Sequence, residues 1–174
     1  KYHGIGLVDG QLLTEHIVVA EEALQHCCKL ATIERHGKNG NISVCPLLGY
    51  GIVNGAVATS VAHDSHNVIC AGDNAIDMVA ACNRLREIGG GYVIASKGKV
   101  IDEFALPYFG LMSDKPVSEA IEGISRLERK AHELHVNPRI DPFTTLSFLA
   151  LPVIPDIRLL DTGLYNVKNG KFYR

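Results

Sequence analysis

The side chains best suited to chemistry lie in one short segment of five consecutive polar residues, called here the His63–Asn67 cluster: His63, Asp64, Ser65, His66 and Asn67. A neutral imidazole can take up or release a proton near neutral pH, and a carboxylate or amide beside it can fix its tautomer. Apolar runs at 56–62 and 68–71 flank the cluster. Because a polar group among buried strands costs free energy unless it is hydrogen-bonded or used, this segment is the first candidate site.

The spacing within the cluster limits how its side chains can act together. His63 and His66 are three residues apart, which on a strand places them on opposite faces, so joint action requires a turn or a bulge between them. Asp64 or Asn67 could orient an imidazole, and Ser65 could donate a hydrogen bond. The alternative is a polar turn whose hydrogen bonds are satisfied within the fold, and the pattern leaves both interpretations open.

A second group of polar residues, Glu34, Arg35 and His36, follows an apolar stretch. An arginine can hold a carboxylate or phosphate with two parallel hydrogen bonds. If the strand continues through this segment, Glu34 and His36 share one face of it and can meet a ligand together. The alternative is the end of a strand with charged side chains in solvent.

Other chemical motifs fail on spacing or order. His132 and His135 lie three apart rather than the four of a zinc-binding HExxH helix. The glycines at 89–91 follow a predicted helix, the reverse of the order in a phosphate-binding loop, and are typical of a helix end. The chain has neither the HxE and PCxxC elements of base-flipping zinc deaminases nor a GxSxG elbow, and it lacks an HxH pair. It therefore contains no complete catalytic constellation.

Composition predicts one domain with a sizeable core. The chain has 174 residues, of which 47% are hydrophobic and 21% charged, with a net charge of -2. No basic run suggests a nucleic-acid partner, and no apolar stretch approaches the roughly 20 residues that span a bilayer. Five cysteines, an odd number without a CxxC pair, favour a reduced, cytoplasmic protein. The start at Lys1, without methionine, suggests part of a longer polypeptide.

The hydrophobic pattern predicts a mixed α/β (α+β) fold, a single domain over residues 1–174 in which β-sheets of mostly short strands are flanked by three or four helices. Strands are expected at 29–35, 42–48, 56–62 and 68–71, with hairpins at 92–106 and near Asn169-Gly170. Helices are expected at 21–28 and 73–88, and from 113 or 114 to 137; residues 143–151 fit a helix or a strand. The apolar stripes expected to face the core are Ile76, Val79, Cys82 or Asn83, Leu85 and Ile88 in the 73–88 helix, and Val117, Ala120, Ile121, Ile124, Leu127, Ala131 and Leu134 in the next.

Several sequence blocks together resemble the carboxy-terminal domain of bacterial adenine deaminases. The longest is Gly55–Asn67, which contains the His63–Asn67 cluster. The others follow in the family's order: Ile33–His36, Gly89–Gly91, Leu106-Pro107 with Gly110–Ser113, Pro142-Phe143 with Leu146–Pro155, and Asp161 with Gly163-Leu164. Leu160 and Phe109 depart from the family's usual threonine and alanine, which affects local detail only.

The resemblance implies an enzyme of the amidohydrolase superfamily that hydrolyses adenine to hypoxanthine and ammonia in purine salvage. It implies a catalytic barrel upstream, holding divalent metal (manganese or iron, with zinc as the alternative), and no metal in this chain. The expected partners are that barrel, adenine, and further copies in a homo-oligomer. In this interpretation the isolated chain is inactive, and it completes or covers the active site.

The resemblance also assigns expected roles to individual residues. His63, Asp64 and His66 are expected to support catalysis, and the expected substrate contacts are Ser65, Asn67, Glu34 and His36. Recruitment of an extra metal by the two histidines and the aspartate of the cluster is a lesser alternative. The rival interpretation is a structural, dimerisation or regulatory module without direct contact to substrate.

Overall fold

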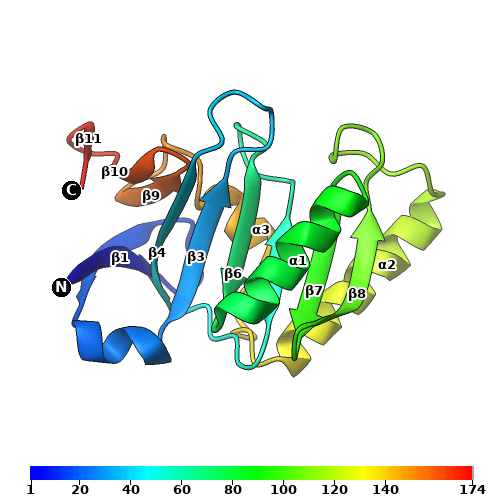
Figure 1. The fold of residues 1–174 in the computed structure, drawn as a ribbon, viewed down its shortest axis with the longest axis horizontal. Helices are drawn as coiled ribbons and strands as arrows, with labels where there is room; N and C mark the ends of the chain where they lie inside the picture. The colour runs from blue at the N-terminus through cyan, green and yellow to red at the C-terminus, as the bar shows by residue number, and fades with distance from the viewer. Residues whose placement is uncertain (174) are drawn as a thin grey trace.

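The computed structural model describes residues 1–173 as two β-sheets and four helices (Figure 1), which confirms the mixed α+β class. The helices are a 3₁₀ helix η1 (Glu21–His26), α1 (Ala75–Glu87), α2 (Val117–Glu133) and α3 (Pro142–Phe148). The strands are β1 (Tyr2–Leu7), β2 (Thr14–Val19), β3 (Cys28–Ile33), β4 (Ile42–Leu48), β5 (Ala56–Thr59), β6 (Val68–Gly72), β7 (Gly91–Ser96), β8 (Lys99–Ala105), β9 (Ile157–Leu160), β10 (Gly163–Asn166) and β11 (Lys171–Phe172).

The larger sheet has eight strands in the order β2-β1-β4-β3-β6-β5-β7-β8. All its neighbouring pairs are antiparallel except β1 with β4. The smaller sheet, β11-β10-β9, lies beside the N-terminal end of the larger one (Figure 1). The predicted hairpins are confirmed at β7–β8, where Lys97 and Gly98 both take positive φ, and at β10–β11.

Helices cover both faces of the large sheet (Figure 1). Helix α1 packs on one face against β5, β6 and β7, whereas α2 and α3 pack on the other. The strand side chains alternate accordingly: Val68 and Cys70 of β6 belong to the core under α1, and Ile69 and Ala71 belong to the larger core under α2 and α3. This alternation explains why β6 is apolar without interruption, since both of its faces are buried.

The strand register brings four connections to one end of the sheet. Ile33 pairs with both Ile42 and Val68, and Thr59 pairs with both Ile69 and Tyr92. Connections 34–41, 60–67, 89–90 and 106–113 therefore leave the sheet at the same end, although they are far apart in the sequence. This end of the sheet positions the candidate residues.

The predicted apolar stripe of the first long helix is wrong in part. Leu85 is buried as predicted, but Ile76 and Val79 are exposed, and the other buried residues of α1 are Asp77, Met78 and Ala81. The helix also begins later than predicted, because the side chain of Asn74, not that of Asp73, accepts the hydrogen bond that caps it. The Asp73 carboxylate accepts hydrogen bonds from the backbone N–H groups of residues 54 and 55 instead.

The predicted stripe of the second long helix is only half buried. Helix α2 packs on the sheet through Gly123, Leu127 and Ala131, whereas Val117 is 75% exposed and Ile121 is 61% exposed. A Cβ atom at position 123 would lie 2.5 Å from the Phe104 ring, so the glycine allows this close approach. The boundaries also differ from the prediction. Pro116 takes the N-cap position without a side-chain hydrogen bond, and the helix ends at Glu133, before Asn137-Pro138.

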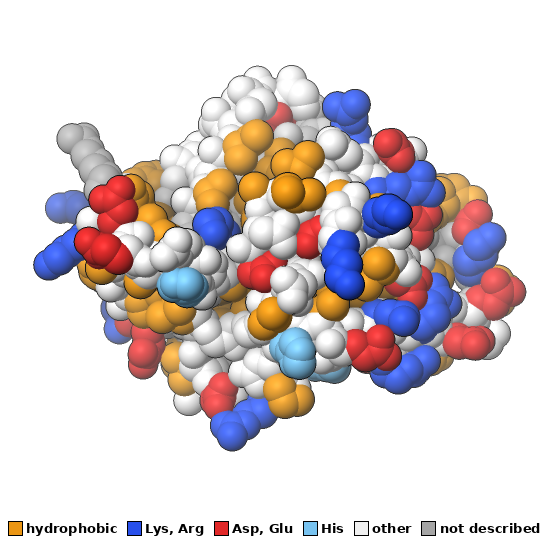
Figure 2. Space-filling model, turned by 60° about the horizontal axis from the view of Figure 1, so that its bottom comes forward, with side chains coloured by type: hydrophobic (Ala, Val, Ile, Leu, Met, Phe, Trp, Pro, Cys, Tyr) orange, Lys and Arg blue, Asp and Glu red, His pale blue; other side chains and the backbone are white. Residues whose placement is uncertain are grey.

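Three further predictions are settled by the coordinates. The strand expected at 56–62 ends at Thr59, and residues 142–148 form a helix. All five cysteines are unpaired; Cys45 and Cys70 are buried as predicted, whereas Cys82 is only partly buried. Within residues 1–173, no helix is long and apolar enough to cross a membrane. On the face drawn in Figure 2, basic and acidic side chains are intermixed.

Truncation of a buried side chain and of an exposed side chain of the α2 stripe should change the free energy of unfolding by different amounts. We expect Leu127→Ala to lower the free energy of unfolding by about 2–5 kcal/mol, because it leaves a cavity in the larger core. The matched control Val117→Ala, on the same helix, should change it by less than about 0.5 kcal/mol. Urea denaturation followed by circular dichroism measures both values, and equal losses would contradict the packing described for α2.

Candidate functional site

The backbone of the His63–Asn67 cluster is fixed from several directions. The N–H of His63 donates to the carbonyl of Ser147 in α3 (2.9 Å), and the N–H of His66 donates to that of Ala62 (2.7 Å). The Arg35 guanidinium donates through Nε to the carbonyl of His66, and His36 donates through Nε2 to that of Ser65 (2.8 Å). The loop is therefore held by α3 on one side and by the connection after β3 on the other.

The side chains of the cluster are much less engaged than its backbone. Within residues 1–173, the side chains of His63, Asp64 and His66 form no hydrogen bond or ion pair; the His63 ring packs against that of Phe148, with centroids 4.7 Å apart. His66 Nδ1 and Asn67 Oδ1 are buried without a partner, and Asn67 is only 4% exposed. A turn that serves folding alone would satisfy such groups, so this arrangement favours a functional interpretation.

Ser65 belongs to the scaffold of the loop rather than to its free groups. Its hydroxyl accepts a hydrogen bond from the backbone N–H of Asn67 (3.3 Å), and its carbonyl is the acceptor for His36. The bend required between the two histidines is present, because His66 takes a positive φ of 51° and the loop turns between β5 and β6. The histidines thus lie on a turn, as their joint action requires.

Arg35 connects two loops instead of presenting its guanidinium to a ligand. Besides the bond from Nε to His66, its Nη2 donates to the carbonyl of Phe109 (2.6 Å). Burial lowers the pKa of the Arg35 guanidinium, because the charged form loses part of its hydration. The sequence predicted a carboxylate or phosphate as the acceptor of this guanidinium, whereas the acceptors in the structure are two backbone carbonyls of this chain.

Glu34 also serves its own loop, which corrects the expectation of a shared strand face. Strand β3 ends at Ile33, so Glu34 and His36 lie in the connection. The Glu34 carboxylate accepts hydrogen bonds from four backbone N–H groups, those of His36, Lys38, Asn39 and Gly40. Desolvation raises the pKa of this carboxyl, but the four donors outweigh it and hold the pKa below its ordinary value.

Ser60 is an organising residue that the sequence-based reasoning missed. Its buried hydroxyl donates to the carbonyl of Gly110 (2.6 Å) and accepts from the N–H of Gly91 (2.8 Å), joining the connection after β8 to the start of β7. Gly90, at φ +112°, lies so close that a Cβ there would be 2.5 Å from the Gly110 Cα. The predicted helix stop at these glycines is confirmed, since the Gly90 N–H bonds to Leu85.

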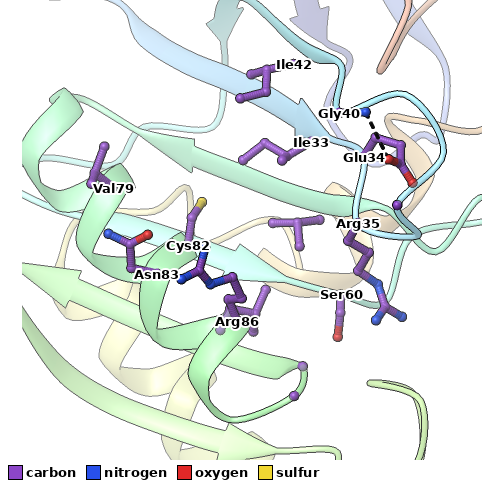
Figure 3. Close-up of a pocket in the computed structure, with 15 residues that line it drawn as sticks. Ile33, Glu34, Arg35, Gly40, Ile42, Ser60, Val79, Cys82, Asn83 and Arg86 are labelled. Atoms are coloured by element: carbon purple, nitrogen blue, oxygen red, sulfur yellow. Dashed lines mark hydrogen bonds between the residues drawn. The ribbon is translucent and has the colours of Figure 1, made fainter.

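Two cavities border these residues, and the predicted site residues that line a cavity are distributed between them. A groove of about 710 Å³ runs between α1 and the 34–40 connection (Figure 3). It is lined by Glu34, Arg35, Ser60 and Arg86 over an apolar floor that includes Ile33, Ile42 and Val79. His63 instead lines a cavity of about 250 Å³ on the opposite face, between α2 and α3. No three His, Cys, Asp or Glu side chains among residues 1–173 are grouped to hold a metal ion, which gives no support to a metal in the cluster.

Comparison of the amino-acid sequence with known proteins finds relatives of this chain. The family model described as "Adenine deaminase C-terminal domain" matches residues 8–171. A protein of Nitratidesulfovibrio vulgaris strain DP4 named "Adenine deaminase" is 49% identical over 145 residues, covering 83% of this chain and 25% of that protein. A protein of the same name from Brucella abortus strain 2308 is 39% identical, covering 99% of this chain and 31% of its own length. The chain thus spans about a quarter to a third of these relatives.

Removing the guanidinium of Arg35 should loosen the cluster. We expect Arg35→Ala to lower the free energy of unfolding by about 1–3 kcal/mol, because two carbonyls lose a charged donor. Amide hydrogen exchange should become faster at His66 and in the 109–112 turn. Arg35→Lys keeps the charge but not the planar fork, so it should recover only part of the loss. Unchanged exchange in Arg35→Ala would contradict the linking role.

The Glu34 connection should loosen in acid. A carboxyl whose folded pKa lies below its ordinary value of 4.5 contributes stability above that value, and this contribution is lost as the pH falls through the folded pKa. Amide NMR signals of residues 38–40 should therefore shift as the pH falls below about 4. Glu34→Gln should remove this transition; a transition that persists in the variant would assign it to another group.

Proposed function

The chain belongs to the adenine deaminase C-terminal domain family, and we propose that it forms the C-terminal part of an enzyme that hydrolyses adenine to hypoxanthine and ammonia. Support comes from the family match over residues 8–171 and from relatives named "Adenine deaminase" that are 39–49% identical. Because those relatives are three to four times longer, the proposal assigns the hydrolytic machinery to polypeptide that this chain does not contain. Purine salvage in the cytoplasm is the physiological setting of the proposal.

The proposal gives this chain a role other than holding metal. Hydrolysis of an amidine such as adenine calls for an activated water, which a bound divalent cation supplies. The described residues do not fit such a cation, since no three potential ligands are grouped. The proposal assigns the divalent metal, manganese or iron with zinc as the alternative, to the remainder of the enzyme, and it expects the isolated chain to be inactive.

One observation carries the proposed role of the His63–Asn67 cluster: its backbone is fixed, while its imidazoles and carboxylate have no partner within the described residues. Such a loop holds polar side chains in place without using them, which is the arrangement needed to meet a group outside the domain. We infer that this group is the purine, or the loop of the catalytic part that encloses it.

The chemistry of the cluster suits a purine edge. Adenine offers an amino donor and ring-nitrogen acceptors, and an amide or imidazole presents the complementary donors and acceptors. Asn67, which has an unsatisfied amide oxygen, is the candidate for contact with the base edge. His63 and His66 are candidates for orienting the base or passing a proton, and Asp64 for fixing an imidazole tautomer. Glu34, His36 and Ser65 contribute indirectly, because their polar groups hold the two connections in position.

The rival proposal is an assembly module without substrate contact. It is favoured by three exposed apolar side chains in the 106–113 connection, those of Tyr108, Phe109 and Met112, which lie next to the cluster through the bond of Arg35 to Phe109. Such side chains are typical of protein–protein contacts. In that case the cluster would serve only to shape the surface, and a homo-oligomer would depend on this connection.

The two proposals differ in how a full-length deaminase carrying this chain responds to His66→Ala and His63→Ala. If the cluster meets the substrate, kcat/KM for adenine should fall at least about tenfold, the effect of losing one hydrogen bond worth about 1.4 kcal/mol. The matched control is His26→Ala, which removes an exposed histidine at the other end of β3 and should leave kcat/KM unchanged.

Normal kcat and KM in both cluster variants would overturn the substrate role. Light scattering on the same samples then measures the oligomeric state. Dissociation of an oligomer by Phe109→Ser, with normal kinetics in the histidine variants, would establish the assembly module instead.

A further inference from the structure

Helix α2 carries more apolar surface than the sheet covers. Its buried row is Gly123, Leu127 and Ala131. A second row, Val117, Ile121, Ile124 and Glu128, follows the four- and three-residue spacing that aligns side chains on one helix face. The first two members of this second row are largely exposed, at 75% and 61%.

The second row leads directly into the 250 Å³ cavity between α2 and α3. Ile124 and Glu128 line that cavity from α2, and Phe143, Thr144 and Ser147 line it from α3. The remaining lining residues are Val61, His63, Tyr92 and Asp141. We call this combined surface, the exposed row with the cavity, the α2–α3 groove. It lies on the face of the sheet opposite α1 (Figure 1).

The groove is acidic at its inner end. Glu128 and Asp141 both line the cavity, and neither forms an ion pair within residues 1–173. One oxygen of Asp141 caps α3 by accepting from the N–H groups of Phe143 and Thr144, while no hydrogen bond engages the other. Burial, and then the charge of Asp141, raise the pKa of the Tyr92 hydroxyl, which agrees with a negative potential at this end.

We propose that the α2–α3 groove is the surface by which this domain docks on the catalytic part of a deaminase polypeptide, and that a basic side chain of that part enters the cavity between Glu128 and Asp141. This inference rests on the proposed function for the identity of the partner. An apolar row that leads into an acidic cavity matches a surface with an arginine or lysine among aliphatic side chains, since the stem of such a residue packs on apolar walls.

Two observations favour this occupant over a second copy of the chain. First, relatives named "Adenine deaminase" contain some 69–75% of their length outside the matched region, so a larger part is present to be contacted. Second, the groove includes His63, so a partner seated there also reaches the cluster. A symmetric contact between two copies of this face would bring the like charges of Glu128 and Asp141 together, which disfavours self-association.

Thiol labelling in the full-length deaminase polypeptide tests the docking without reference to activity. Val117→Cys and Ile76→Cys introduce thiols at positions that are 75% and 72% exposed in this domain, on opposite faces of the sheet. If the groove is covered, a maleimide should label position 117 at least about tenfold more slowly than position 76 in the native protein, and equally fast in urea. Labelling of the native cysteines is measured in the parent protein and subtracted.

Charge reversal and dilution complete the test. Glu128→Arg should raise the labelling rate at position 117, because it repels an incoming basic side chain; an unchanged rate would overturn the basic contact. Equal labelling rates at positions 117 and 76 in the native protein would overturn the docking surface. Protection of position 117 that disappears when the protein is diluted to monomer would also overturn it, because that result would assign the groove to a second copy of the chain. None of these outcomes depends on whether the histidine variants retain activity, so a failure of the substrate role remains distinguishable.

Discussion

The guanidinium of Arg35 joins the connections on which the candidate site is built. One planar group donates to the carbonyl of His66 and to that of Phe109, so it holds the 34–41, 60–67 and 106–113 segments together. A lysine at this position has no planar fork with which to span both carbonyls. Ser60 adds a second link, from Gly91 to Gly110, in the same region. The strands bring these loops to one end of the sheet, and the two polar links determine how the loops lie relative to one another.

Local signals in the sequence predicted β4, β6 and the hairpins at β7–β8 and β10–β11, whereas β1, β2 and β9 were not predicted. The Lys97-Gly98 turn needs two positive φ values that glycine and a neighbouring polar residue can adopt, and β6 is apolar because helices cover both its faces. The faces of the helices were predicted less well. Periodicity shows that Ile76 and Ile121 fit an apolar stripe at helical spacing, but burial depends on which row of side chains the sheet packs against. Helix α1 packs on the sheet through Ala81 and helix α2 through Gly123, because these small residues allow the helices to approach closely.

Some residues of the candidate site could likewise be predicted from the sequence, and others could not. The His63–Asn67 cluster was visible as polar residues between apolar strands, which is a violation of local pattern typical of functional loops. The role of Glu34 was not visible, because four of its partners are backbone N–H groups, and the sequence carries no sign of where they point. Ser60 was missed for a similar reason. A single serine at a strand end is ordinary, and its importance arises from contact with glycines 31 and 50 residues away.

Three unsatisfied features of the domain concern groups that a second surface could complete. Within residues 1–173, His66 Nδ1 and the Asn67 amide oxygen are buried without a hydrogen-bond partner, and Val117 and Ile121 of α2 are exposed although they are apolar. Each of these costs free energy in an isolated domain, since buried polar atoms lose hydration and apolar side chains order water. His63 belongs both to the cluster and to the cavity beside the α2 row, so one partner seated in the α2–α3 groove would offset the exposed row and reach the cluster in the same contact. The physical argument for a docked partner and the argument for a site shared with that partner therefore meet at His63.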